Sequence, residues 1–492
     1  MKISRTKIKI NKILFLLFCL SFGSVFILSG CSLFSSPKKI AVKIPKKFKY
    51  ALKNGNMPVK NDWWKNFGDK ELDILVGEAV KNNLNYLIAV KNIQVAKTYV
   101  SQNESNLFPV VNFNFSTTRN KLPGYETSIF SGSGSSGAAS TVIYNLNQAG
   151  LSASYELDAW NQVNNAIKQA KANVAVSKED ADVVKLTLIS NVAQAYFQIS
   201  ALEKSADNLR KQYAAEKEIL KLYMIQYKDG LIDAEPVETA KTNLEILKTE
   251  LNDSVKLQDI TENTLAYYIG KFPEKFKFKT DTKAGNFNGY NGMNYSNLIP
   301  PNIPSEILTQ RPDVKGAEYS VLSYAYAKKE SLANFFPVLN LTGNYGYASP
   351  GLNNFVTDTN SVWNFGLNIL APIFNYKTNI SIYKRSKLQY QQAVLNYRNA
   401  VINAFSETDS ALANYKRDVK TLKSYENNFN YSLKLFHIYG IQYKTGIASR
   451  ITYLTYKLDM LNAEYNLINQ NLLLQEDVIG VYNALGMGLK TD

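Results

Sequence analysis

The chain contains a repetition that sets the plan of its fold. The phrase IQYKDG at 225–230 returns as IQYKTG at 441–446. The block NLFPVVNFNFSTT at 106–118 returns as NFFPVLNLTGNYG at 334–346. Self-similarity of this kind indicates that one structural plan is present twice. The interval between copies is slightly longer for the FPV block, because a longer Gly/Ser-rich segment follows this block in the first copy.

The repetition divides the 492 residues into two halves. We expect repeat 1 over 62–270 and repeat 2 over 303–492, with a polar, Pro-rich linker at 271–302 between them. A chain of this length exceeds the size at which a single core usually stops growing. The sequence therefore predicts two internal structural repeats.

Each repeat contains two runs in which apolar and polar residues alternate. The runs lie at about 109–118 and 150–158 in repeat 1, and at about 337–347 and 362–371 in repeat 2. Alternation over this length is typical of tilted transmembrane β-strands with one face in lipid. A soluble antiparallel sheet with one wet face has the same pattern, and the N-terminal segment described below favours the membrane.

Most of the remaining residues are predicted to form unusually long helices. They cover 69–107, 160–227 and 233–269 in repeat 1, and 305–335, 373–444 and 448–485 in repeat 2. A helix of nearly 70 residues reaches roughly 100 Å, so two short helices stacked end to end match one long helix. Apolar residues recur every seven positions along the first long helix, which is the coiled-coil signature: Ile167, Val174, Ala181, Leu188, Ala195, Leu202 and Leu209.

The number of strands limits the possible assemblies. Four membrane strands cannot close a barrel, because the smallest closed barrels have about eight strands. An open sheet edge is not tolerated in lipid, so several copies must share one barrel. Three copies would give twelve strands. The predicted fold class is an α+β membrane protein in which a shared β-barrel is continued by a helical barrel.

The N-terminus has the order of a signal peptide over residues 1–30. The basic run MKISRTKIKINK precedes a 15-residue apolar core, which is short for a transmembrane helix. The LSGC tetrapeptide at 28–31 resembles the bacterial lipobox, whose cysteine accepts a diacylglycerol. We therefore expect Cys31 to be the lipidated first residue of the mature chain, followed by a Lys-rich tether over 31–61. By resemblance to sorted lipoproteins, Ser32 points to the outer membrane.

The composition argues against several other classes of protein. The formal net charge of +15 suggests nucleic-acid binding, but five of the positive charges lie in the predicted signal peptide and most others are scattered. The lone His437 has no second histidine for a metal site or for catalysis. Gly132, Gly134 and Gly137 spell G-x-G-x-x-G in a Ser/Gly-rich loop without a βαβ unit. We expect no enzymatic activity, no cofactor and no nucleic-acid partner.

Several segments resemble the outer-membrane efflux protein family, the TolC-like and OprM-like exit ducts. The resemblance rests on DWWKNFGDKELDILVGEAVKNNLNYLIA at 62–89, IPSEILTQRPDVKGAE at 303–318 and VYNALGMGL at 481–489. Its most specific element is the repeat 2 signature Arg311, Pro312 and Asp313, followed by the second FPV block. The resemblance covers essentially the whole mature chain.

The resemblance implies a homotrimer with a twelve-stranded outer-membrane β-barrel, four strands per chain, on a long periplasmic α-helical barrel. It implies a passive duct for small molecules, either drugs or metal ions, whose periplasmic entrance opens by untwisting of helix pairs. The implied partners are a periplasmic adaptor protein and an inner-membrane pump of the resistance-nodulation-division type. A channel for type I protein secretion, or a non-porous coiled-coil lipoprotein, remains an alternative.

The resemblance places the entrance at the two repeated phrases. Gly230, Leu231, Gly446 and Ile447 are the expected hairpin tips, where an adaptor would dock. The candidate gate residues are Tyr227, Tyr443, Asp233, Glu235 and Arg450.

The chain departs from the family at three positions near the tips. Pro236 and Thr452 stand where well-known members carry aspartate, and Ala448 stands where they carry arginine. We therefore expect Asp233, Glu235 and Arg450 to form a substitute charge network.

Overall fold

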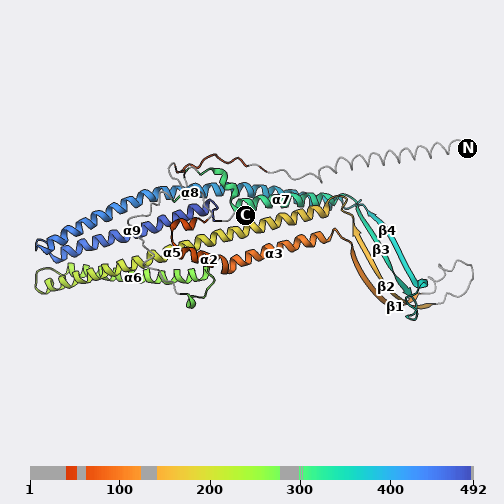
Figure 1. Ribbon diagram of the computed structural model, residues 1–492, viewed down its shortest axis with the longest axis horizontal. Helices are drawn as coiled ribbons and strands as arrows, with labels where there is room; N and C mark the ends of the chain where they lie inside the picture. Colours follow the sequence, from red (N-terminus) through yellow and green to blue (C-terminus); the bar gives the residue numbers. More distant parts are fainter. Residues whose placement is uncertain are drawn as a thin grey trace, which may run out of the picture. The chain divides into compact units, whose positions relative to one another are not determined.

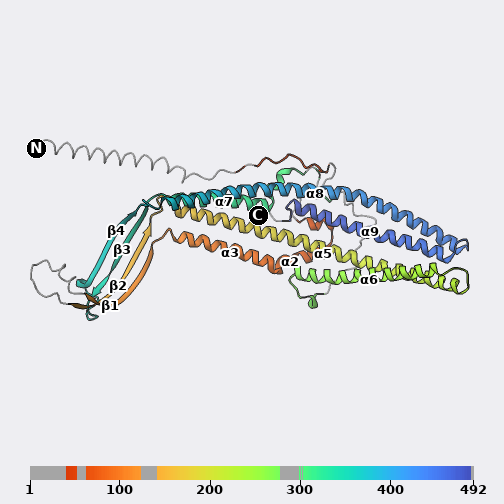
Figure 2. The same ribbon diagram turned by 180° about the vertical axis from the view of Figure 1, so that it is seen from behind.

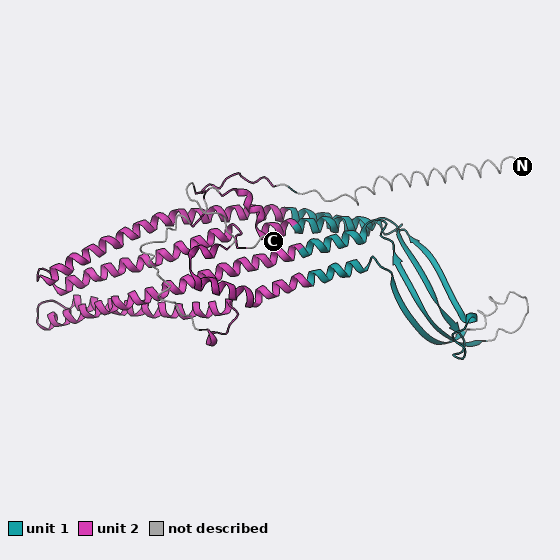
Figure 3. Cartoon of the chain, viewed as in Figure 1, with its two compact units in different colours: residues 1–40, 95–174, 319–394 teal, residues 41–94, 175–318, 395–492 magenta. Residues whose placement is uncertain are grey.

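The computed structural model describes residues 40, 42–52, 62–122, 141–276, 298, 299, 301 and 303–488. The predicted signal peptide, Cys31, the Gly132 loop, and much of the tether and linker lie outside these described residues. The chain divides into two compact units, coloured separately in Figure 3. Unit 1 comprises residues 1–40, 95–174 and 319–394, and unit 2 comprises residues 41–94, 175–318 and 395–492.

Unit 1 contains a four-stranded antiparallel sheet in the order β1-β2-β3-β4 (Figure 1). The strands are β1 (Val110–Leu122), β2 (Val142–Glu156), β3 (Val338–Ser349) and β4 (Ser361–Leu370). All four predicted strands are present, but β1 and β2 extend further into the predicted loop. The extensions pair from Arg119↔Asn145 to Leu122↔Val142, with mostly polar residues on β1 and mostly apolar residues on β2. Backbone pairing does not require apolar side chains, so alternation could not reveal these ends.

The two faces of the sheet differ in polarity. Phe113, Leu151, Tyr345 and Trp363 lie opposite one another across the four strands, and all four side chains are exposed. Trp363 is 75% exposed, and Phe365, two residues further along β4, is 76% exposed. Exposed apolar side chains in one continuous row indicate a face that is not designed for water.

The opposite face carries amides and hydroxyls. Asn112, Ser152, Asn344 and Asn364 occupy one row across the strands. Within this face the Asn344 amide donates to the Asn364 side chain at 2.9 Å. Both outer strands, β1 and β4, have one strand neighbour each in the described part of the chain. Each therefore leaves one row of backbone groups unpaired within a single chain.

The helices follow the predicted order, with two corrections. They are α2 (Lys70–Asn82), α3 (Leu84–Ser105), α5 (Gln162–Lys228), α6 (Glu235–Tyr268), α7 (Pro312–Ala333), α8 (Tyr376–Lys444) and α9 (Arg450–Ala484). The single helix predicted over 69–107 is wrong, because Asn83 is extended (ψ 122°) and separates α2 from α3. The helix predicted over 305–335 is likewise interrupted at Arg311 (ψ 136°), between the 3-10 helix Ser305–Gln310 and α7.

Both interruptions have a local cause. The Asn83 side-chain oxygen accepts a hydrogen bond from the Tyr86 backbone N–H at 3.0 Å, which caps the start of α3. Arg311 precedes Pro312, and the proline ring disfavours a helical conformation at the residue before it.

Unit 2 contains two helical hairpins that pack against each other. In Figures 1 and 2, α6 runs beside α5 and α9 runs beside α8. Ala215 and Ile219 of α5 pack with Leu454 of α9 in a buried cluster, which joins the two hairpins.

Of the seven heptad residues predicted on α5, five are buried: Ile167, Ala181, Leu188, Ala195 and Leu209. Among the described residues, no helix is both long enough and apolar enough to span a bilayer.

Two aromatic contacts join the N-terminal segments of unit 2 to its second hairpin. Phe48 is buried and its ring stacks on Phe405 of α8, with 5.1 Å between centroids. Trp63 stacks on Tyr482 of α9 at 5.2 Å, and its indole N–H donates to the Met487 carbonyl at 3.1 Å. The predicted tether and the WW segment therefore both contact the second hairpin.

Candidate functional site

The two hairpins turn in the same way at the repeated phrases. Gly230 and Gly446 adopt left-handed φ angles of 69° and 74°. The amide of Gly230 donates to the Tyr227 carbonyl at 3.1 Å, and the amide of Leu231 donates to the Gln226 carbonyl at 2.8 Å. This pair of bonds ends an α-helix in a Schellman motif, in which glycine meets no Cβ penalty. Gly446 and Ile447 make the same pair of bonds, to Tyr443 and Gln442.

Each tip exposes an apolar side chain directly after its glycine. Leu231 is 72% exposed and Ile447 is 77% exposed. Exposed apolar groups of this size indicate a contact surface when several of them lie together.

The helices that follow the tips begin with different caps. Ser449 Oγ accepts from the Thr452 amide at 3.0 Å and caps α9, so Thr452 lies in the first turn of that helix. On the other hairpin, Asp233 accepts from the Glu235 amide at 3.3 Å, next to the start of α6. Asp233 therefore satisfies a free N–H group at the helix start.

Arg450, the first residue of α9, forms a two-point ion pair with Glu218 of α5. Arg450 Nε lies 2.8 Å from Glu218 Oε1, and Arg450 Nη2 lies 3.1 Å from Glu218 Oε2. The hydrogen bond from Arg450 is the largest influence on the Glu218 carboxyl and lowers its pKa. This pair connects the second hairpin to the first near their tips.

Two tyrosines support the guanidinium. The centre of the Arg450 guanidinium lies 5.1 Å from the ring centroids of both Tyr443 and Tyr453. The two rings stack at 5.4 Å with an interplanar angle of 19°. Stacking and cation–π attraction restrict the Arg450 side chain, so it meets Glu218 in a defined geometry.

The predicted charge network is therefore wrong in one respect. Within the described part of the chain, the ion pair of Arg450 is with Glu218 and not with Asp233 or Glu235. The charged residues predicted for this network, Asp233, Glu235 and Arg450, all follow a tip glycine. Glu218 instead precedes Gly230, on a helix in which charged residues are common.

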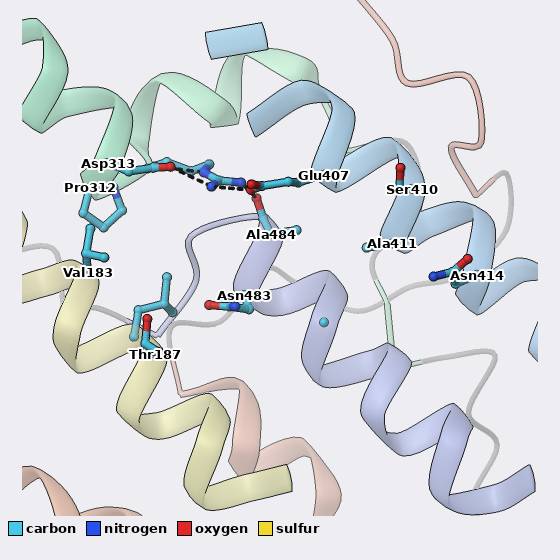
Figure 4. Close-up of a pocket in the computed structure, with 13 residues that line it drawn as sticks. Val183, Thr187, Pro312, Asp313, Glu407, Ser410, Ala411, Asn414, Asn483 and Ala484 are labelled. Atoms are coloured by element: carbon cyan, nitrogen blue, oxygen red, sulfur yellow. Dashed lines mark hydrogen bonds and ion pairs between the residues drawn. The ribbon is translucent and has the colours of Figure 1, made fainter. Parts of the chain in front are cut away.

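The family signature forms a second cluster, shown in Figure 4. Arg311 is 7% exposed and donates from Nε and Nη2 to Asp313, at 3.0 and 2.7 Å. Its Nη2 also donates to Glu407 of α8 at 2.8 Å, and its Nη1 donates to the carbonyl of Ala484, the last residue of α9, at 2.5 Å. Pro312 is the first residue of α7. We call Arg311, Asp313, Glu407 and Ala484 the Arg311 cluster.

A cavity of about 470 Å³ borders the Arg311 cluster. Its wall includes Val183 and Thr187 of α5, Asn414 of α8 and Asn483 of α9 (Figure 4). Asn483 and Ala484, the last two residues of α9, are both part of this wall.

A comparison with protein families identifies the chain. The model of the outer membrane efflux protein family matches residues 75–271 and 303–487. The chain belongs to this family. Among its relatives, the cation efflux system protein CusC of Escherichia coli K12 is 26% identical over 486 residues, covering 95% of this chain and 99% of CusC. The probable outer membrane lipoprotein SilC of Salmonella typhimurium is 26% identical over 496 residues, covering 96% and 99%.

Solved structures of outer membrane channels share the fold. The Campylobacter jejuni CmeC channel superposes with a TM-score of 0.78, at 24% identity, over 93% of this chain and 95% of CmeC. The open state of the Neisseria gonorrhoeae MtrE channel superposes with a TM-score of 0.77, at 23% identity, over 93% and 98%. As a member of the outer membrane efflux protein family, this protein is an efflux channel component of the outer membrane.

Proposed function

We propose that three copies of this chain form one passive exit duct of a tripartite efflux system. The two open sheet edges support this assembly, because each chain offers β1 and β4 for pairing with its neighbours. The row of exposed apolar residues that contains Trp363 would then face lipid, and the amide-rich face would line the lumen. Three chains would supply the twelve strands of one outer-membrane barrel together with a periplasmic helical barrel.

The two halves of the chain are copies of one unit in this proposal. Both contain a short helix, two strands, a long helix and a return helix. Gly230 and Gly446, at the ends of the repeated phrases, terminate the long helices with the same hydrogen bonds. Asn83 and Arg311 interrupt the short helices at equivalent positions, since each precedes the FPV block of its own repeat by the same interval.

The periplasmic entrance is closed near the tips by the Arg450–Glu218 ion pair. This contact carries the proposal, because it connects the two hairpins of one chain at the point where they would have to separate. Tyr443 restricts Arg450, whereas Tyr227, Asp233 and Glu235 lie near the tip of the first hairpin, where neighbouring chains would meet them. Gly230, Leu231, Gly446 and Ile447 form the surface on which a periplasmic adaptor docks.

The other parts of the system are inferred from chemistry and from the relatives. An inner-membrane pump of the resistance-nodulation-division type would supply the energy, and a lipid on Cys31 would anchor the chain in the outer membrane. The relatives include a cation efflux protein and a pyoverdine export protein. We propose small molecules, drugs or metal ions, as the cargo, with the choice made by the pump.

Reconstitution tests this function directly. The purified chain should migrate as a trimer on unheated gels and as a monomer after heating, and it should conduct ions in planar bilayers. A monomeric or fibrous product without conductance would favour a structural lipoprotein. Export of an unfolded polypeptide by cells that carry this chain, without small-molecule efflux, would favour type I secretion.

A further inference from the structure

Arginine side chains hold both ends of α9. At its first residue, Arg450 pairs with Glu218 of α5. At its last residue, the Ala484 carbonyl accepts hydrogen bonds from Arg311 Nη1 at 2.5 Å and from Thr408 Oγ1 of α8 at 2.9 Å. The C-terminal carbonyls of a helix carry partial negative charge, so a guanidinium is a favourable partner there.

The first hairpin has a corresponding contact with different chemistry. We call each such contact, between the break of the short helix and the end of the return helix, a joint. Asn83 is the repeat 1 equivalent of Arg311, and its side-chain amide donates to the Tyr268 carbonyl at 3.0 Å. Tyr268 is the last residue of α6, and it follows Gly230 by the same interval at which Ala484 follows Gly446. In both joints a side chain at the break of the short helix therefore reaches the last carbonyl of the return helix. The Asn83 joint is neutral, whereas the Arg311 cluster is charged and includes α8 through Glu407.

We infer that Arg311 is a positioning residue for the entrance. It fixes the height of α9, meaning its position along the helix axis relative to α5 and α8, so that Arg450 meets Glu218. This inference rests on the proposed gate. A helix is stiff along its axis, so a displacement at Ala484 reaches Arg450 with little loss. A slip by one residue is about 1.5 Å, which would stretch a hydrogen bond of normal length beyond the limit at which it forms.

The surroundings of Ala484 explain why this role falls to Arg311. The cavity of about 470 Å³ borders the last turn of α9, and Asn483 and Ala484 are part of its wall. On its other sides this end of the helix is packed, because Tyr482 stacks on Trp63 and the Met487 carbonyl accepts from the Trp63 indole N–H. On the cavity side, Arg311 and Thr408 supply two hydrogen bonds to the final carbonyl of the helix.

The repeat offers a matched control. Asn83→Ala loosens the corresponding joint on α6 and leaves the contacts of α9 unchanged. Thr408→Val removes the second donor to Ala484 with little change of volume, and it provides a milder variant if Arg311→Gln fails to assemble. Arg311→Lys keeps the charge but loses the forked geometry that reaches two carboxylates and a carbonyl together.

Two measurements on the full-length trimer separate this inference from the proposed gate. In the first, nitroxide labels on Lys221→Cys of α5 and Thr455→Cys of α9 report the height of α9 by pulsed electron paramagnetic resonance. We expect Arg311→Gln, Arg311→Lys and Thr408→Val to shift or broaden the label distance by about 1.5 Å or more, and Asn83→Ala to leave it unchanged. An unchanged distance in the Arg311 and Thr408 variants would overturn the inference.

The second measurement is the conductance of the same variants in planar bilayers. Arg311→Gln should raise the open probability by about two- to fivefold, as expected from the loss of a partly exposed ion pair. In an Arg450→Gln background, Arg311→Gln should raise the open probability little further, because the ion pair through which Arg311 acts is already absent. An equal increase in both backgrounds would show a general structural role and overturn the inference. A shifted label distance with unchanged conductance in Arg450→Gln would instead overturn the proposed gate.

Discussion

The carboxyl groups of Asp477 on α9 and Asp418 on α8 lie next to each other. Burial, followed by the contact with Asp418, raises the pKa of Asp477 to about 7. A carboxyl group whose pKa is raised in the folded state stabilises the fold fully below its unfolded value of about 4. This stabilisation is lost as the pH rises through about 7, because the buried Asp477 carboxyl then becomes charged.

We therefore predict that the second hairpin becomes less stable between pH 5 and pH 8. Asp477→Asn should remove most of this dependence and raise the midpoint of thermal unfolding at pH 8. Circular dichroism of the purified trimer at both pH values measures the effect. Asp253→Asn, on the exposed surface of α6, is the control and should change neither curve. A wild-type midpoint that rises between pH 5 and pH 8 would contradict the prediction.

A charge on the apolar face of β4 should be much more costly than the same charge on the polar face. Phe365→Lys places an ammonium group in the proposed lipid-facing row, and we expect it to destabilise the barrel by about 2–4 kcal/mol if Phe365 lies near the middle of the bilayer. Asn364→Lys, one residue away on the other face, should cost far less. The temperature at which the trimers dissociate on gels measures the stability of both variants. Equal losses of trimer stability would show that neither face is in lipid.

Two glycines with left-handed φ angles should respond differently to alanine. A Cβ on Gly446 would meet no atom within 4 Å, so Gly446→Ala incurs only the backbone penalty of about 1–2 kcal/mol. A Cβ on Gly486, with φ of 70°, would lie 2.8 Å from Arg311 Cγ and 3.1 Å from its Cα. Gly486→Ala should therefore lower the thermal midpoint more than Gly446→Ala does. A larger loss of thermal midpoint for Gly446→Ala than for Gly486→Ala would mean that the Arg311 side chain can move away from the added Cβ.

The proposed lipid anchor has a control in the signal peptide that precedes it. Cys31→Ala should abolish incorporation of labelled fatty acid and leave the signal peptide uncleaved, because the thiol that accepts the lipid is missing. Cys19→Ala, in the segment that would be removed, should change neither result. Labelled lipid on the Cys31→Ala protein would refute this assignment.

The sequence could predict the number and order of elements because two periodicities are visible in it. Exposed residues such as Phe113 and Trp363 alternate with polar ones, and buried residues such as Leu188 recur every seven positions. The break at Asn83 could not be predicted in this way, because its cap depends on a single local hydrogen bond inside a helix-like pattern.

The candidate site was harder to predict than the fold. Arg450 could be identified from its place after the tip glycine, whereas Glu218 is distant in sequence and becomes its partner only when α5 and α9 pack together. The partners of Arg311 similarly come from three elements. Tertiary contacts between distant helices, rather than local patterns, determine both clusters.

A charge exchange at the tips tests the central claim most directly. Arg450→Glu and Glu218→Arg each place like charges together between α5 and α9, and each should raise the open probability of the trimer in planar bilayers. The double variant restores an ion pair of opposite orientation and should return the open probability close to that of the wild type. Single variants that conduct like the wild type, or a double variant as open as the single ones, would contradict the claim that this pair closes the entrance.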